Sequence, residues 1–223
     1  MNTRYLVVAI AAIALGGFAA SALVFQRPPP VSPVTSAENI SEESILERLY
    51  SPSFGPADAP VTVVEFFDPV CEACRAFHPT VKAILAKYPE DVRVVLRYTP
   101  FHDSSEEIVR LLEAARMQDV YEPVLEAILE TQPKWARHGS PQIELAYQAA
   151  AAAGLDVEKA RKFMQLPDIT SIVLQDMAEV KSVGVRGTPT FFVNGKPLPE
   201  FGQRQLVEFV DAEVAAARTK SRQ

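Results

Sequence analysis

The chain has 223 residues, a net charge of −6, 48% hydrophobic residues and 22% charged residues. This length and composition are typical of one large or two small globular domains. The acidic balance argues against a nucleic-acid-binding protein. Two cysteines are too few for the disulfide framework of a small secreted scaffold.

The first 25 residues have the pattern of an export signal. Met1–Arg4 is a short basic segment, and residues 5–25 carry no charge over a length that can span a bilayer. Ala20-Ser21-Ala22 is a small-residue cleavage pattern. We expect a signal peptide or an uncleaved signal anchor, two alternatives that the sequence leaves open. The rest of the chain is then exported to the periplasm of a Gram-negative bacterium, free or tethered to the inner membrane.

Residues 26–58 are predicted to form a linker and a short helix. The run Pro28-Pro29-Pro30 indicates an extended segment. Ser41 precedes apolar residues at helical spacing and is predicted to be the N-cap of a short helix. Three prolines and a glycine predict a loop over residues 51–60.

Both cysteines lie where a predicted strand passes into a predicted helix. The β-branched, apolar run Val61–Phe67 indicates a buried strand, and apolar spacing predicts a helix from Cys71 to about Tyr88. A Cys-x-x-Cys at such a junction puts Cys71 at the helix N-terminus, where unpaired N–H groups and the helix dipole favour a thiolate. Cys74 lies one turn further, close enough to attack a mixed disulfide. The pattern therefore predicts redox chemistry.

Other uses of a cysteine pair fit less well, and we expect no metal at this site. A structural zinc site needs four ligands, and besides the cysteines the chain has only three histidines. Attachment of a c-type haem requires histidine directly after the second cysteine, where Arg75 stands. A structural disulfide between residues three apart closes a very small loop and stabilises little.

The middle of the chain is predicted to be almost entirely helical. Residues 91–98 indicate a second strand, parallel to the first because a helix joins them. Residues 102–182 then show helical periodicity with no strand signal. The candidate helices cover residues 104–118, 121–131, 141–153, 157–165 and 169–182.

Strand character returns near the C-terminus. Gly187–Val193 predicts a strand, and Asn194-Gly195 predicts a hairpin turn that leads to a return strand over residues 196–198. Residues 203–217 predict an amphipathic helix. A polar tail is expected over residues 218–223.

This order of elements, with Cys71-x-x-Cys74 and Thr188-Pro189, resembles the thioredoxin superfamily, and the long helical block resembles its DsbA-like branch. The resemblance implies an α/β, thioredoxin-like fold with an inserted all-helical domain. Residues 59–101 together with 183–217 would form the thioredoxin-like domain, and residues 102–182 the helical insertion.

The resemblance also implies roles for individual residues. Cys71 would be the attacking cysteine and Cys74 the resolving one. Pro189 would be cis, and Thr188 before it would line the groove where a substrate strand binds. Glu65 would be the buried acid that such proteins hold beneath the cysteines.

The position of Glu65 supports this last expectation. Side chains alternate along a strand, so Glu65 shares a face with Val61 and Val63. Burial on this face would raise the pKa of the carboxyl group. Glu65 could then take and return the Cys74 proton during exchange.

The two residues between the cysteines depart from the DsbA prototype. Glu72 and Ala73, which we count among the substrate-binding residues, stand where the prototype has proline and histidine. A carboxylate beside Cys71 disfavours the thiolate. We expect a pKa of Cys71 below the value of about 8.5 for a free thiol, but above the prototype's, and therefore a milder oxidant.

We expect a protein thiol-disulfide oxidoreductase that forms disulfides in reduced or unfolded exported proteins. Its redox centre would be the Cys71–Cys74 disulfide, with no other cofactor, and a DsbB-type membrane partner would reoxidise it. The alternatives are a reductase or isomerase kept reduced by a DsbD-type partner, and a copper-binding protein that uses both thiolates. Isomerases of this kind usually dimerise through an N-terminal extension, and the roughly 25 residues between Phe25 and Ser51 are short for one, which favours the oxidase. We expect a monomer.

Three methionines bear on the copper alternative. Met117, Met164 and Met177 are spread along predicted helices at no ligand spacing and are predicted to fill the core. The net direction of electron flow, the substrates and the reduction potential do not follow from the sequence.

Overall fold

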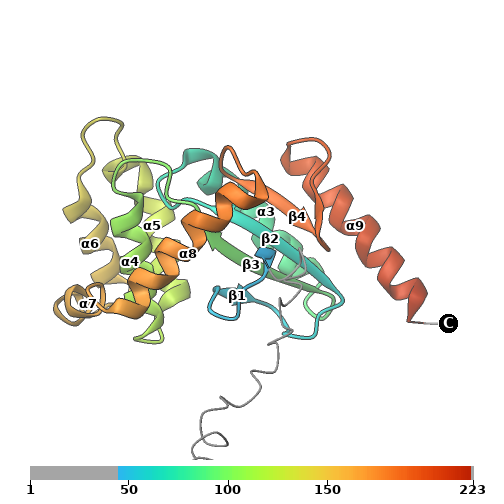
Figure 1. The fold of residues 1–223 in the computed structure, drawn as a ribbon, viewed down its shortest axis with the longest axis horizontal. Helices are drawn as coiled ribbons and strands as arrows, with labels where there is room; N and C mark the ends of the chain where they lie inside the picture. Colours follow the sequence, from blue (N-terminus) through green and yellow to red (C-terminus); the bar gives the residue numbers. More distant parts are fainter. Residues whose placement is uncertain (1–44, 222–223) are drawn as a thin grey trace, which may run out of the picture. The chain divides into compact units, whose positions relative to one another are not determined.

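The computed structural model describes residues 45–221, so the predicted signal segment, the predicted proline-rich linker and residues 41–44 of the predicted short helix lie outside the described residues. Within that range, Ile45 and Leu46 are helical and Glu47 and Arg48 are not, so the helix does not continue to Leu49 as its apolar spacing suggested. A five-stranded sheet with the order β1-β3-β2-β4-β5 forms the centre of the fold (Figure 1).

The central strand of the sheet is the predicted β-branched run. β2 (Val61–Phe67) pairs in parallel with β3 (Val92–Tyr98) and antiparallel with β4 (Thr190–Val193). Almost every residue of β2 is buried, which a continuous apolar run suits because the strand is covered on both faces. Both predicted strands and their parallel pairing are confirmed.

The two edges of the sheet are short. β5 (Lys196–Pro197) returns antiparallel to β4 through Asn194 and Gly195, whose φ angles are 49° and 76°. Two positive φ angles are what a two-residue hairpin of this type requires, so the predicted hairpin is confirmed. The other edge strand, β1 (Ser53–Phe54), pairs antiparallel with β3. It was not predicted, because residues 51–60 contain enough proline and glycine to indicate only a loop.

Helices cover both faces of the sheet. α3 (Glu72–Lys87) and α9 (Gln203–Lys220) pack on the face that carries Val61 and Val63. α8 (Pro167–Val183) packs through Val180 against Val64 and Phe66 on the other face. α9 is longer than predicted, since residues 218–220 of the expected polar tail are still helical.

The helical insertion is confirmed as a group of helices beside the sheet. In Figure 1, four helices lie together, and α8 leads back from them to the sheet. The four are α4 (Ser105–Arg116), α5 (Tyr121–Trp135), α6 (Ile143–Ala152) and α7 (Val157–Phe163).

The insertion and the sheet share one hydrophobic core. Val63 of the sheet, Val81 of α3 and Leu125 of α5 belong to the same cluster of buried side chains. α5 also runs four residues past its predicted end, through a proline, because Trp135 is fully buried and its Nε1–H donates to the carbonyl of Ile128 at 3.0 Å.

The expectation that the methionines fill the core is wrong for two of them. Met164 is 5% exposed, whereas Met117 is 46% and Met177 is 39% exposed. Among residues 45–221, no helix combines the length and the apolar character needed to cross a membrane.

A buried ion pair fastens α8 to β3. Arg97 and Asp176 are 0% and 1% exposed, and their side chains are 2.8 Å apart. The second carboxylate oxygen of Asp176 accepts the backbone N–H of Tyr98 at 2.8 Å. Since α8 closes the insertion, this pair fixes the place where the helical segment rejoins the sheet.

Removal of the Asp176 carboxylate should therefore be costly. Asp176→Ala leaves Glu179 as the remaining counter-ion of the buried Arg97 guanidinium and removes the acceptor of the Tyr98 N–H, so it is expected to lower the free energy of unfolding by about 2–4 kcal/mol. Glu208→Gln removes the partner of an exposed pair with Arg204 and is expected to cost less than about 1 kcal/mol. Urea unfolding measures both, and equal losses in the two variants would contradict the assignment.

Candidate active site

The cysteines occupy the junction between β2 and α3. Cys71 is the N-cap of α3 with extended backbone angles, and Cys74 lies in the first turn of the helix. Cys71 is 6% exposed and Cys74 is fully buried, and both are free thiols. Only the first sulfur is therefore within reach of another molecule.

A fully buried aspartate holds the loop before Cys71. The Asp68 carboxylate accepts the backbone N–H of Val70 at 2.9 Å and that of Phe101 at 2.8 Å. It also accepts the Ser105 hydroxyl at 2.6 Å, and His102 Nδ1 lies 2.7 Å from it. These contacts tie the loop to the start of the helical insertion.

The residues before β4 face the first cysteine. The Cys71 thiol donates to the carbonyl oxygen of Thr188 at 3.2 Å, and the Thr188–Pro189 peptide bond is cis. The Thr188 hydroxyl oxygen is buried and has no hydrogen-bond partner among residues 45–221. Thr188 lowers the pKa of Cys71.

The two thiols have opposite electrostatic surroundings. The hydrogen bond with Cys74 lowers the pKa of Cys71 to about 5, and Thr188 and the backbone N–H groups of Cys74 and Ala73 add to this against the effect of burial. Burial raises the pKa of Cys74 far above that of an ordinary thiol, and the hydrogen bond with Cys71 and the charge of Glu65 add to it. At neutral pH, Cys71 is a thiolate and Cys74 keeps its proton. The expected depression of the Cys71 pKa below that of a free thiol is confirmed.

Glu65 lies beneath the cysteines as an unpaired acid. It is 2% exposed, and in the described part of the chain its Oε1 has no hydrogen-bond partner. Burial, and then the charge of Cys71, raises its pKa to about 8. The prediction of a buried carboxyl group with a raised pKa is confirmed.

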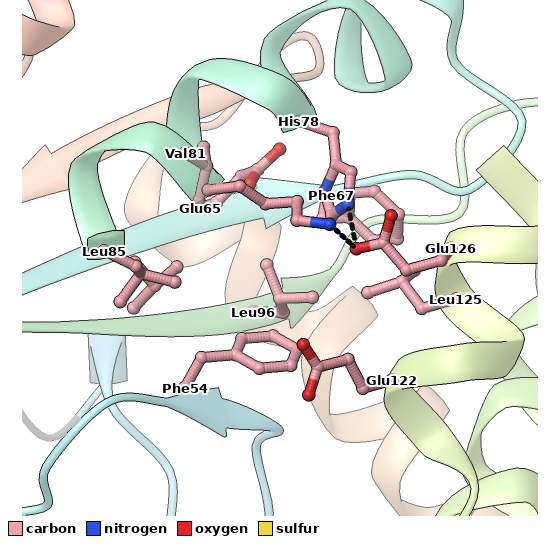
Figure 2. Close-up of a pocket in the computed structure, with 12 residues that line it drawn as sticks. Phe54, Glu65, Phe67, His78, Val81, Leu85, Leu96, Glu122, Leu125 and Glu126 are labelled. Carbon is pink, nitrogen blue, oxygen red and sulfur yellow. Dashed lines mark hydrogen bonds and ion pairs between the residues drawn. The ribbon is translucent and has the colours of Figure 1, made fainter. Parts of the chain in front are cut away.

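A small cavity of about 40 Å³ opens beside Glu65 (Figure 2). One water needs about 10–15 Å³ of such space, so the cavity has room for water next to the carboxyl group. On its far side, Glu126 Oε1 lies 2.8 Å from His78 Nε2 and 2.9 Å from Lys82 Nζ. Polar side chains of α3 and α5 therefore line the same cavity as Glu65.

The charge of Glu72 has a partner that the sequence did not indicate. Its carboxylate lies 2.9 Å from His138 Nε2, although the two residues are 66 positions apart. Its own backbone N–H, and then His138, lower the pKa of Glu72. Glu72 is thus a partly exposed carboxylate in contact with the His138 ring. The backbone N–H of Ala73 helps to lower the pKa of Cys71.

Gln132 is a second residue that the sequence did not point to. It is 1% exposed on α5, and its amide nitrogen donates to the carbonyl of Pro69 at 2.9 Å and to that of Cys71 at 3.1 Å. Its amide oxygen accepts from Arg75 Nε at 2.9 Å. One feature of the sequence could have indicated Gln132. It occupies a position of α5 that the helical spacing of apolar residues assigns to the buried face.

The structure thus gathers Glu65, Cys71, Cys74, Thr188 and Pro189 at one end of the sheet. In the described part of the chain, no group of three or more His, Cys, Asp or Glu side chains is placed to hold a metal ion. A dithiol at a helix N-terminus, faced by a cis-proline on a mixed sheet, defines the class of thioredoxin-like dithiol proteins.

Comparison with known proteins agrees with this class. The Thioredoxin family model matches residues 48–212, and the chain belongs to this family. A solved thioredoxin-like oxidoreductase of Silicibacter pomeroyi is 32% identical, with a TM-score of 0.66 over 77% of this chain and 96% of that one. Wolbachia pipientis α-DsbA1 is 19% identical, with a TM-score of 0.69 over 81% of this chain and 98% of that one, and shows the shared fold. The predicted fold and its DsbA-like insertion are confirmed.

A curated relative contains a similar segment within a longer protein. The Na(+)/H(+) antiporter NhaA of Herminiimonas arsenicoxydans is 30% identical over 167 residues, which are 74% of this chain and 26% of the antiporter. The chain therefore spans about a quarter of the length of this relative.

The raised pKa of Glu65 predicts how stability depends on pH. Between the unfolded value of about 4.3 and the folded value of about 8, the folded protein keeps a proton that the unfolded chain has lost, so stability falls as pH rises. Glu65→Gln removes this loss. From pH 4 to pH 7, the stability of Glu65→Gln relative to the wild type is expected to grow by about 2–4 kcal/mol.

Urea unfolding of the reduced protein at the two pH values measures this change. Glu130→Gln, at an exposed position of α5, is the matched control and should leave the pH dependence as it is. A constant difference between Glu65→Gln and the wild type at both pH values would show that Glu65 ionises normally.

Proposed function

We propose that this chain is an exported thiol-disulfide oxidoreductase that forms disulfides in reduced proteins. The observation that supports the proposal most directly is that the two thiols differ in exposure and in pKa. Cys71 is slightly exposed and has a pKa of about 5, whereas burial raises the pKa of Cys74. A stabilised thiolate is a good leaving group, and stabilising the reduced form makes a disulfide oxidising.

In the proposed reaction, the oxidised protein starts with a Cys71–Cys74 disulfide. A substrate thiolate attacks the sulfur of Cys71, the bond between the cysteines breaks, and the electron pair goes to Cys74. Because the pKa of Cys74 is raised, its sulfur takes a proton as it leaves. Glu65, with a pKa of about 8, is protonated at neutral pH and supplies that proton.

The second half of the reaction releases the product. Another substrate thiolate attacks the substrate sulfur of the mixed disulfide, and Cys71 leaves as a thiolate. The substrate has then lost two electrons and gained a disulfide, and the protein has become the dithiol. Thr188 and Pro189, with Glu72 and Ala73 on the other side of Cys71, are the proposed contacts of the substrate chain.

The location and partners belong to the same proposal. The charge-free segment over residues 5–25 supports export to the periplasm, by a signal peptide or a membrane anchor. The substrates are reduced or unfolded exported proteins. A DsbB-type membrane protein would accept the two electrons and regenerate the disulfide, and the protein would act as a monomer.

Single cysteine variants test the reaction on a reduced, unfolded substrate protein. Cys71→Ala should abolish disulfide formation, since no attackable bond remains. Cys74→Ala, first activated at Cys71 as a mixed disulfide with a small aromatic thiol, should exchange that thiol for the substrate and accumulate a mixed disulfide at Cys71. Non-reducing gels and mass spectrometry show both. Disulfide formation by Cys71→Ala at the wild-type rate would contradict the proposal.

The state of the cysteines in cells separates the competing functions. An oxidase should be mostly in the disulfide form, as measured by thiol trapping. A predominantly dithiol form would favour the reductase or isomerase kept reduced by a DsbD-type partner. Tight copper binding without activity on reduced substrates would favour the metal-binding alternative.

A further inference from the structure

We propose that Gln132 is a positioning residue through which the helical insertion holds the N-terminus of α3 in the geometry that stabilises a thiolate at Cys71. This inference deepens the proposed function and rests on it. It concerns a side chain 61 residues away from Cys71 in the sequence that does not touch the reacting sulfur.

The amide of Gln132 donates hydrogen bonds to two backbone carbonyls of the turn before α3, and these carbonyls have few other donors. Pro69 is buried, and within residues 45–221 its carbonyl accepts no hydrogen bond other than that from Gln132. The Cys71 carbonyl accepts a second bond from the same amide, besides the N–H of Arg75 at 3.2 Å. Without Gln132 the Pro69 carbonyl would be left buried and unpaired, a state that proteins avoid by moving the backbone.

The turn that Gln132 holds carries the groups that act on the Cys71 sulfur. The backbone N–H groups of Cys74 and Ala73, in the first turn of α3, lower the pKa of Cys71. The Cys71 carbonyl belongs to the same rigid peptide unit as the Glu72 N–H, and the first turn of α3 continues from that unit. Fixing the carbonyls of Pro69 and Cys71 therefore fixes where the first turn of α3 begins.

Gln132 also orients a side chain of α3. Its amide oxygen accepts from Arg75 Nε at 2.9 Å, so one amide group bonds to three points on the loop and the helix. Gln132 is 1% exposed, and water does not compete for these bonds. The Gln132 side chain therefore links α5 to the loop and the helix turn that carry Cys71.

The test compares Cys71 ionisation in variants of the reduced protein. Gln132→Met keeps the side-chain length and removes all three bonds, and it is expected to lower the acid ionisation constant of Cys71 about tenfold, the equivalent of one hydrogen bond. The ultraviolet absorbance of the thiolate as a function of pH measures that constant. The equilibrium with glutathione should shift toward the disulfide form of the protein, since a less stabilised thiolate makes a weaker oxidant.

Tyr147→Phe is the matched control. It removes the hydroxyl that donates to Glu107 at 2.9 Å, inside the insertion and outside the cysteine site. It is expected to leave Cys71 ionisation within twofold of the wild type. An equal change in Tyr147→Phe and Gln132→Met would show that only general stability matters and would overturn the proposal.

If Gln132→Met does not fold, a second variant tests the same proposal. Gln132→Glu keeps an acceptor for Arg75 but loses the amide donors, and its added charge acts in the same direction on Cys71. Wild-type ionisation of Cys71 in either folded variant overturns the proposal. The proposed function fails separately, if the wild type forms no disulfides in a reduced substrate, because the ionisation measurement needs no substrate.

Discussion

The site depends on how the loop between β2 and α3 is held. Cys71 gains its thiolate character from first-turn N–H groups and from the Cys74 thiol, and these act only if the turn keeps its shape. Two buried side chains fix the turn from opposite ends. Asp68 accepts backbone and side-chain donors at the start of the insertion, and Gln132 donates to the carbonyls of Pro69 and Cys71. The helical insertion is therefore part of the site and not only a neighbour of it.

The two buried acids near the cysteines differ in what they bond to. Asp68 accepts several strong hydrogen bonds and serves as an anchor. Glu65 has an unpaired oxygen, a raised pKa and a cavity beside it (Figure 2). A buried carboxyl group without hydrogen-bond donors favours its protonated form, and this raises its pKa. This difference suits Asp68 to structure and Glu65 to proton transfer.

The sequence predicted the elements whose pattern is local. The β-branched run of β2, the helical spacing of α3 and the Asn194-Gly195 turn each specify their structure over a few residues, and all three are confirmed. β1 was missed because its two residues form a strand only by pairing with β3. The continuation of α5 to Trp135 was missed because burial of the indole, and not helix propensity, extends the helix.

The same distinction holds for the site. Cys71 and Cys74 belong to one short sequence motif. The alternation of side chains along the strand placed Glu65 on the correct face of the sheet. The partners from the insertion, Gln132 and His138, reach the motif only through tertiary packing, and their spacing in the sequence carries no signal. For this reason the prediction from the sequence took Glu72 to be a charge without a partner, whereas in the structure its carboxylate contacts the His138 ring.

The central claim is that Cys71 is stabilised as a thiolate relative to Cys74, so that the disulfide between them is oxidising. The most direct measurement is the equilibrium reduction potential of the Cys71–Cys74 pair against glutathione. A Cys71 pKa of about 5 lies between those of thioredoxin and DsbA. The potential is therefore expected between about −220 and about −130 mV. A value at or below about −270 mV, that of thioredoxin, would contradict the account.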